Sequence, residues 1–320
     1  MAELKIISMD EVQSKEVNWL WYPYIPYGKI TIIQGDPGEG KTTLALRLAA
    51  LLSKGEPLPY DTTEREPVKI IYQTAEDGLE DTIKPRLEAA EADCTQIKVI
   101  DESEAALSML DDRIEKAIIE VGARVVILDP IQAYVGANIN MNNANEVRNV
   151  MAQLGRIAEK YDCAILLVGH MNKGSGNKSS YRGLGSIDFQ ASARSVLIVG
   201  RIKDNPQVRV IVQDKSSLAP EGEAIAFELD KENGFRWLGH YDISVDDLLS
   251  GIPREKKSEQ AENLILEYLS KGKYPQKELV KKAQAAGISK RVLDEAKKAL
   301  NVQSVKEGSQ WYWQLPEKME

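Results

Sequence analysis

The stretch KITIIQGDPGEGKTTLALRLAALLS, residues 29–53, decides the fold. Its first part, KITIIQ (29–34), is a short apolar run that predicts a buried strand, and its last part, KTTLALRLAALLS (41–53), predicts a helix. Between them, GDPGEGKT (35–42) fits the pattern G-x-x-x-x-G-K-[ST]. Its glycines let backbone N–H groups close around an anion without a Cβ clash, and the helix amino terminus adds partial positive charge. The stretch therefore predicts a loop that binds the phosphates of a nucleotide.

The side chains of this loop have separate expected roles. Lys41 is expected to bridge the β- and γ-phosphates of ATP, and the Thr42 hydroxyl is expected to bind Mg²⁺. A chance glycine-rich turn is the alternative, but the strand before the loop and the helix after it argue against that. The residues expected to hold the nucleotide are Gly35, Asp36, Pro37, Gly38, Glu39, Gly40, Lys41, Thr42 and Thr43.

A second apolar run ends in an acid. ARVVILDPIQ (123–132) delivers Asp129 at the carboxyl end of a predicted strand, where it is expected to be the second anchor for Mg²⁺. Many nucleotide hydrolases place a glutamate directly after this aspartate to activate water, but this chain has Pro130 there. A strand-end aspartate in a turn before proline is the alternative reading.

The missing base has a candidate on another strand. The sequence QTAED places Glu76 just past the strand predicted over 68–73. Ligands sit beyond the carboxyl ends of the strands in a doubly wound sheet, so Glu76 is expected to reach the γ-phosphate from the side. The alternative is a favourable charge at the amino terminus of the following helix.

From about residue 28, short apolar strands alternate with amphipathic helices, which predicts a doubly wound α/β sheet. Runs that are apolar throughout indicate parallel strands covered on both faces. After residue 194 no helices separate the strands, which predicts an antiparallel extension of the same sheet. The predicted strands are 68–73, 97–100, 124–128, 163–169, 194–202, 207–215, 224–230 and 234–239; the helices are 78–92, 103–121 and 143–160; and 131–145 and 171–186 are expected to be loops.

Composition sets wider limits. Hydrophobic residues make up 43% of the 320 residues, enough for a full core, and the net charge of −8 argues against a general nucleic-acid coat protein. Cys94 and Cys163 form no spacing motif and are expected to be buried thiols in a reducing compartment. The chain has neither an apolar window of about 18 residues nor a signal-peptide pattern, so a cytoplasmic protein without membrane contact is expected.

The sign of the charge changes near residue 251. Residues 1–251 hold 27 Lys and Arg and 39 Asp and Glu, whereas residues 252–309 hold 13 and 8. The sequence SGIPREKKSEQ at this point has the Gly, Pro and charges of a linker. We therefore predict one domain over 1–250, a linker over 251–257 and a second domain over 258–320.

The second domain has the pattern of a winged helix-turn-helix, with three helices followed by a hairpin that turns at Glu307 and Gly308. Ser289 is the expected N-cap of the third helix. That helix is basic, and its first residues, Lys290 and Arg291, are expected to contact DNA in the major groove. Winged helices also dock onto proteins, so a protein partner is the alternative.

Taken as an ordered set, GDPGEGKT, YQTAED, VVILDP and LLVGHMNK with the Gly-rich stretch after it resemble the RecA/DnaB-like ATPases, over about residues 15–240. Within these, the chain looks most like the RepA-type hexameric ATPases and helicases of plasmids, phages and mobile elements. The resemblance implies a RecA-like P-loop NTPase core that uses ATP and Mg²⁺. It also implies a homo-oligomer, most simply a hexameric ring, that acts on single-stranded DNA.

The same resemblance implies roles for further residues. His170 matches the residue that senses the γ-phosphate and couples it to DNA-facing loops, a satisfied structural histidine being the alternative. The two long loops match those DNA-facing loops, and Lys173, Lys178 and Arg182 supply positive charge there unless they are simply solvated.

Arg194 matches the region of an arginine finger that acts on the neighbouring subunit's ATP, and Lys215 matches a lysine at the same interface. Where the DnaB pattern often has an arginine, this chain has Ser217. This departure leaves the residue that acts in trans open between Arg194, Arg201 and Lys215.

Two functions follow. The leading one is Mg²⁺-dependent ATP hydrolysis by a ring-forming motor on single-stranded DNA, most simply a replicative helicase of a mobile element. Its catalytic residues are expected to be Glu76, Lys41, His170, Arg194 and Lys215. The alternative is an ATP-dependent DNA-binding, assembly or regulatory ATPase that does not unwind DNA.

Overall fold

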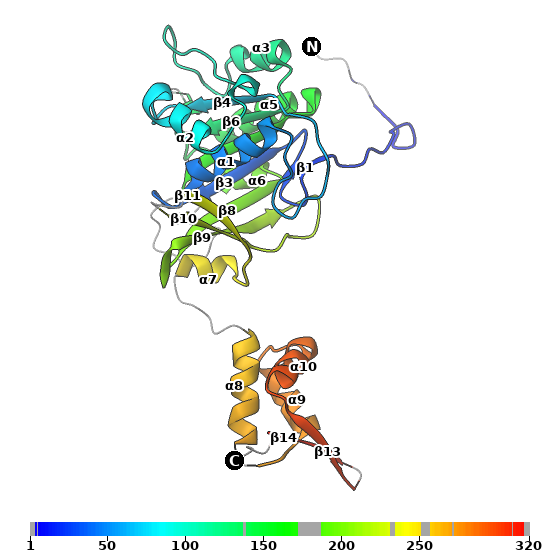
Figure 1. Cartoon of the computed structure of the whole chain (residues 1–320). Helices are drawn as coiled ribbons and strands as arrows, with labels where there is room; N and C mark the ends of the chain where they lie inside the picture. Colours follow the sequence, from blue (N-terminus) through cyan, green and yellow to red (C-terminus); the bar gives the residue numbers. More distant parts are fainter. Residues whose placement is uncertain are drawn as a thin grey trace. The chain divides into compact units, whose positions relative to one another are not determined.

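The computed structural model describes residues 4, 6–136, 139–171, 187–230, 234–250, 257–270, 272–308 and 310–316. The chain forms two compact units, Met1–Gly251 and Ile252–Glu320. Both appear in Figure 1, and each is considered by itself.

A mixed sheet organises the first unit. In the described part of the chain it has nine strands in the order β11-β10-β9-β8-β3-β7-β6-β4-β5. The strands from β8 to β5 run parallel to one another, and β9, β10 and β11 continue the sheet as antiparallel neighbours, as predicted. Their bounds are β3 Ile30–Gly35, β4 Ile70–Thr74, β5 Ile97–Lys98, β6 Val125–Asp129, β7 Ala164–His170, β8 Ser195–Ile202, β9 Asn205–Ser216, β10 Ile225–Asp230 and β11 Gly234–His240.

Helices cover both faces of this sheet (Figure 1). Alternate residues of β6 enter different cores, because successive side chains of a strand point to opposite faces. Val125 and Ile127 pack with α1 (Lys41–Ser53) and α2 (Lys84–Ala89). Val126 and Leu128 pack with the helices of the other face, which are α3 (Asp112–Val121), α4 (Ile131–Tyr134), α5 (Ala144–Tyr161) and α6 (Ile187–Ser192). The continuous apolar character of the strands follows from this two-sided burial.

Three local predictions differ in part from the structure. The helix expected over 78–92 is a π-helical turn, η1 (Leu79–Ile83), followed by α2. The helix expected from residue 103 begins only at Asp112, because side-chain bonds to the backbone, such as Glu102 to the Leu107 N–H, hold the preceding residues in another path. The stretch 131–145 is not all loop, because Ile131 and Tyr134 are buried and form α4.

Two smaller elements complete the first unit. The strands β1 (Trp19–Trp21) and β2 (Ile25–Pro26) form a hairpin that is not hydrogen-bonded to the main sheet. Helix α7 (Val245–Ser250) packs Leu248 against β8 and β9. Cys163 is buried as expected, whereas Cys94, in the turn η2 (Cys94–Gln96), is only half-buried. Among the described residues, no helix combines the length and apolar character that crossing a bilayer requires.

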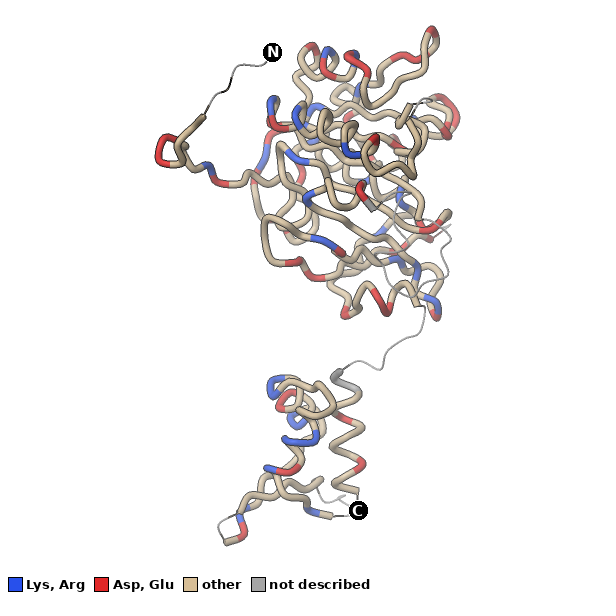
Figure 2. The backbone as a smooth tube through the Cα atoms, turned by 180° about the vertical axis from the view of Figure 1, so that it is seen from behind, with Lys and Arg blue, Asp and Glu red and all other residues tan. Residues whose placement is uncertain are grey.

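The second unit has its own core. Helices α8 (Lys257–Leu269), α9 (Gln276–Ala285) and α10 (Lys290–Ala299) pack with a small sheet of order β12-β14-β13 around Ile265, Leu279, Leu293 and Trp313. The bounds of its strands are β12 Tyr274–Pro275, β13 Gln303–Glu307 and β14 Gln310–Gln314. Ser289 caps α10 by accepting the Val292 N–H. Basic residues recur along α9 and α10, as Figure 2 shows.

Candidate active site

The loop between β3 and α1 depends on glycine at three positions. A Cβ built on Gly35 would lie 2.1 Å from the Val199 carbonyl oxygen, so no side chain fits there. Gly38 and Gly40 have φ of +80° and +90°, which L side chains rarely adopt. Gly40 is also the N-cap of α1. The backbone can therefore curl over the amino end of α1 only with this spacing of glycines, and the curl suits phosphate groups.

Lys41 lies inside this loop. Its Nζ donates to the carbonyl oxygens of Gly35 at 3.0 Å and Asp36 at 2.9 Å, and lies 3.1 Å from Nδ1 of His170. Burial lowers the pKa of the amine, while the charge of Asp129 is the largest influence that raises it. The first turn of α1 and the carboxyl end of β7 thus bring the predicted phosphate-binding lysine against the predicted sensor.

Asp129 ends β6 and faces the start of α1. It accepts a hydrogen bond from the Tyr72 hydroxyl at 3.0 Å. Burial raises the pKa of its carboxyl, and the side chains of Thr42 and Tyr72 counteract that. Thr42 and Asp129 supply hard oxygen donors, the type that Mg²⁺ prefers, and a Mg²⁺ held this way takes its other ligands from phosphates and water. The residues present therefore fit the predicted metal.

Glu76 follows β4, which lies two positions from β7 and three positions from β3 in the sheet. Thr74 pairs with Asp129, and the Ala75 N–H donates to the Asp129 carbonyl oxygen at 3.2 Å, so β4 and β6 end together. The Glu76 side chain is 64% exposed, and its Oε2 lies 3.8 Å from Nε2 of His170. The structure therefore brings five predicted residues from three strand ends and one helix start to one place: Lys41, Thr42, Glu76, Asp129 and His170.

Comparison with known proteins identifies the family of this chain. Residues 3–176 match the model of the AAA domain family. The chain belongs to this family. The solved ATPase domain of G40P shares the fold with a TM-score of 0.50 at 15% identity, covering 67% of this chain and 85% of that one. The resemblance to RecA/DnaB-like P-loop ATPases is thereby confirmed.

Curated relatives of this AAA-domain chain include DNA repair proteins. RadA of Halalkalibacterium halodurans is 30% identical over 165 residues, which is 51% of this chain and 32% of the relative. RadA of Helicobacter pylori strain J99 is 26% identical over 215 residues, 66% of this chain and 42% of the relative. The chain thus spans less than half the length of these relatives.

The three cationic residues considered for the role in trans lie at two different places in the structure. Arg201, at the carboxyl end of β8, donates to the Gly38 carbonyl oxygen at 3.1 Å and lies 3.7 Å from the Glu39 carboxylate. Arg194 precedes β8, and its N–H donates to Ile30 at the amino end of β3. Lys215 donates to the carbonyl oxygens of Gln190 and Ala191 at the end of α6. Arg201 therefore lies on its own chain's loop, and the other two lie at the opposite end of the sheet.

Only some of the residues expected to contact DNA lie in the part of the chain that the structure describes. Lys173, Lys178 and Arg182 lie outside the described residues. Lys290 and Arg291 are exposed at the start of α10 in the second unit.

Two polar residues at the site were missed at the sequence level. Tyr72 donates to Asp129, and Gln132 donates through Nε2 to the His170 carbonyl oxygen at 3.3 Å. The first contact joins the neighbouring strands β4 and β6, and the second joins α4 to the end of β7. Only the position of Gln132, three residues after Asp129, was a usable signal.

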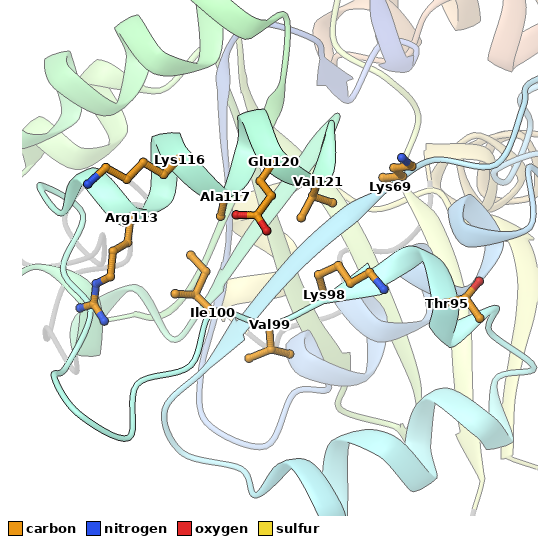
Figure 3. Close-up of a pocket in the computed structure, with 10 residues that line it drawn as sticks. All are labelled: Lys69, Thr95, Lys98, Val99, Ile100, Arg113, Lys116, Ala117, Glu120 and Val121. Atoms are coloured by element: carbon orange, nitrogen blue, oxygen red, sulfur yellow. The ribbon is translucent and has the colours of Figure 1, made fainter.

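A groove of about 600 Å³ lies apart from this site, at the β5 edge of the sheet (Figure 3). None of the predicted site residues is among those that line it. Its lining combines four basic side chains with several apolar ones and consists of Lys69, Thr95, Lys98, Val99, Ile100, Arg113, Lys116, Ala117, Glu120 and Val121.

Proposed function

We propose that this chain is a Mg²⁺-dependent ATPase that assembles as a ring, most simply a hexamer, and moves along single-stranded DNA. A replicative helicase of a mobile element of the RepA type is the simplest such protein. The observation that carries the proposal is the approach of Glu76 and Lys41 to opposite nitrogens of one histidine, His170, while Thr42 and Asp129 meet beside them.

In this reading each residue has one task. Backbone N–H groups of the loop and the Lys41 amine bind the β- and γ-phosphates. Thr42 and Asp129 would hold Mg²⁺, which would supply positive charge beside the phosphates. Glu76 accepts a hydrogen bond from the attacking water and orients it. His170 touches both Lys41 and Glu76, so it registers whether a γ-phosphate is present.

A cation from a neighbouring subunit completes the site in this proposal. Arg194 and Lys215 cannot serve their own loop, because they lie at the amino end of the sheet. An arginine brought in trans stabilises the transition-state charge and raises turnover by about 10³–10⁵-fold in related phosphoryl transfers. Their location supports a role at the loop of an adjacent copy.

For the second unit we propose a winged helix that binds DNA, spanning residues 258–320 after a linker over 251–257. Its three helices, its hairpin and the exposed basic start of α10 support this. The alternative for the whole chain, an ATPase that assembles on DNA without unwinding it, is favoured by the DNA repair proteins among its relatives.

The test is steady-state ATP hydrolysis by the wild type and Glu76→Gln, each with and without single-stranded DNA. We expect stimulation by DNA in the wild type. In the variant, turnover should fall by about 10²–10⁴-fold while calorimetry still shows ATP binding, because only the water-orienting group is lost. Asp77→Asn is the matched control, since Asp77 instead forms an ion pair with Arg86 at 3.2 Å. Equal turnover of Glu76→Gln and wild type would disprove the assigned base.

A forked duplex separates the two functions. Strand separation coupled to ATP hydrolysis supports the motor. Turnover with ATP-dependent assembly on DNA, but without strand separation, supports the alternative.

A further inference from the structure

We propose that Arg201 and Arg209 are positioning residues that neutralise the Glu39 carboxylate and hold it away from the phosphates of the nucleotide. The inference rests on the proposed function, because it concerns how the same loop admits ATP. It gives a role to Arg209, which none of the motifs includes, and it explains how a carboxylate can stand inside a phosphate-binding loop.

The first observation is the place of Glu39 in the loop. It lies two residues before Lys41, between the two glycines of positive φ, Gly38 and Gly40. Its side chain is 16% exposed. The phosphates of ATP are strongly negative, and a carboxylate this close to them repels them unless nearby positive charge compensates it.

The compensating charge comes from β8 and β9. Arg201 Nε lies 3.7 Å from Oε2 of Glu39, and Arg201 Nη2 donates to the Gly38 carbonyl oxygen at 3.1 Å. Burial raises the pKa of the Glu39 carboxyl, and the charges of Arg201 and Arg209 are the largest influences that lower it. Two positive charges therefore act on this one carboxylate.

The two arginines in turn need an anion beside them. Arg201 and Arg209 are direct partners across the antiparallel strands β8 and β9, so their side chains lie on the same face of the sheet. Like charges at directly opposite positions repel one another. Among the described residues, Glu39 is the acid that forms an ion pair with Arg201. The shared carboxylate relieves the repulsion and leaves the three groups together with a net positive charge.

Packing holds Arg209 in place. The residue is 9% exposed, and its Nη1 donates to the Pro206 carbonyl oxygen. Its cross-strand partner on β10 is Phe227, whose ring would lie 3.7 Å from a Cβ on Gly40. Burial lowers the pKa of the Arg209 guanidinium, and the charge of Glu39 counteracts that. Arg209 therefore presents a fixed positive charge to the loop.

A double-mutant cycle on ATP binding tests the proposal. Calorimetry follows the binding of a non-hydrolysable ATP analogue with Mg²⁺ by the full chain. Arg209→Gln should weaken binding by about tenfold, a loss within the range that interacting residues show, because it leaves Glu39 less compensated beside the phosphates. Adding Glu39→Gln to this variant should restore most of the lost affinity, since the charge that needed compensation is then gone. Arg209→Lys, which keeps the charge, should bind nearly as the wild type does.

Two further variants complete the test. Arg236→Gln removes an arginine that pairs with Glu228 at 2.8 Å on the β10–β11 hairpin, and it should leave binding unchanged. Arg201→Gln changes a side chain that is 40% exposed and should show the same rescue by Glu39→Gln, even if Arg209→Gln does not fold. Wild-type affinity in Arg209→Gln, or a double variant as weak as Arg209→Gln, would overturn the positioning role alone. No binding of the analogue by the wild type would overturn the proposed function and this role with it.

Discussion

The carboxyl group of Asp129 is buried in the folded chain, where 7% of the residue is exposed. Burial raises the pKa of this carboxyl above its ordinary value of 3.8. The folded state therefore binds the proton more tightly than the unfolded chain does. The contribution of Asp129 to the free energy of unfolding therefore falls as the pH rises from 3.8 to the higher pKa of the folded state. The ionised Asp129 carboxylate therefore lowers the stability of the fold, although it supplies a ligand for a cation.

We predict that Asp129→Asn raises the melting temperature at neutral pH, measured without Mg²⁺ and nucleotide. The gain should shrink as the pH falls towards 3.8, because the wild-type carboxyl is then protonated. Each kcal/mol corresponds to about 2–4 °C in a domain of this size. The same variant should lose Mg²⁺-dependent turnover.

Asp111→Asn is a control of opposite sign, since a hydrogen bond from Arg113 lowers the pKa of Asp111. That variant should lower the melting temperature at neutral pH, and the loss should shrink in acid. A lower melting temperature for Asp129→Asn at neutral pH would contradict the assigned cause.

Several residues of the candidate site lie at or just after the ends of strands, and apolar runs in the sequence predict where these strands end. An apolar run that stops at an acid marks the edge where ligands bind, and Asp129 was found in this way, whereas His170, at the end of β7, was implied by the resemblance to a known family. Tyr72 was not, because its bond to Asp129 depends on β4 lying next to β6. A single sequence carries no direct signal for such a neighbour.

At the scale of elements, α10 allows a test of the DNA-binding proposal. Leu293 and Ala296 face the core of the second unit, and Lys290 and Arg291 are exposed at its first turn. We predict that replacing both basic residues by alanine weakens duplex binding. The slope of log K against log salt should fall by about two, since each phosphate contact contributes about one.

The matched control is Lys277→Ala with Lys281→Ala, which removes the same charge from exposed positions of α9. Equal losses for the two pairs would mean that net charge, and not α10, accounts for binding. Duplex binding unaffected by the α10 pair would favour a protein partner for this unit.

Elements with a strong pattern and a clear cap were placed well. The helix predicted over 41–53 has those bounds, because Gly40 caps it and Ser53 ends its buried face. The segment 103–111 was misjudged, since Asp101 and Glu102 accept hydrogen bonds from nearby backbone N–H groups and so compete with a helix, while Asp111 caps the helix that begins at residue 112. Local competition of this kind depends on small differences in free energy that periodicity does not measure.

At the scale of the whole molecule, the two ends of β8 have different expected roles. Arg201, at the carboxyl end, contacts the loop of its own chain, whereas Arg194, at the amino end, is proposed to act on a neighbouring copy. We predict that mixing Lys41→Ala with Arg194→Ala restores partial turnover, although each variant alone is inactive. In a mixed ring, an intact loop of one variant lies beside an intact Arg194 of the other at roughly a quarter of the interfaces. Steady-state ATP hydrolysis of the mixture measures this.

Mixing Lys41→Ala with Arg201→Ala should restore nothing, because Arg201 contacts Gly38 of its own chain. Recovery with Arg201→Ala but not with Arg194→Ala would reverse the assignment of the residue that acts in trans. The sequence alone left this choice open, since it shows neither which end of β8 each arginine occupies nor what that end contacts.

The unequal burial of the two cysteines has a practical consequence for such mixtures. Maleimide dyes react with thiolates, and burial raises the pKa of the Cys163 thiol to about 12. Cys94, half-buried in its turn, is left as the reactive position of the native fold. One dye on each subunit would then sit at equivalent places around an assembly. Energy transfer between donor- and acceptor-labelled chains can report their exchange in real time, with no cysteine added or removed.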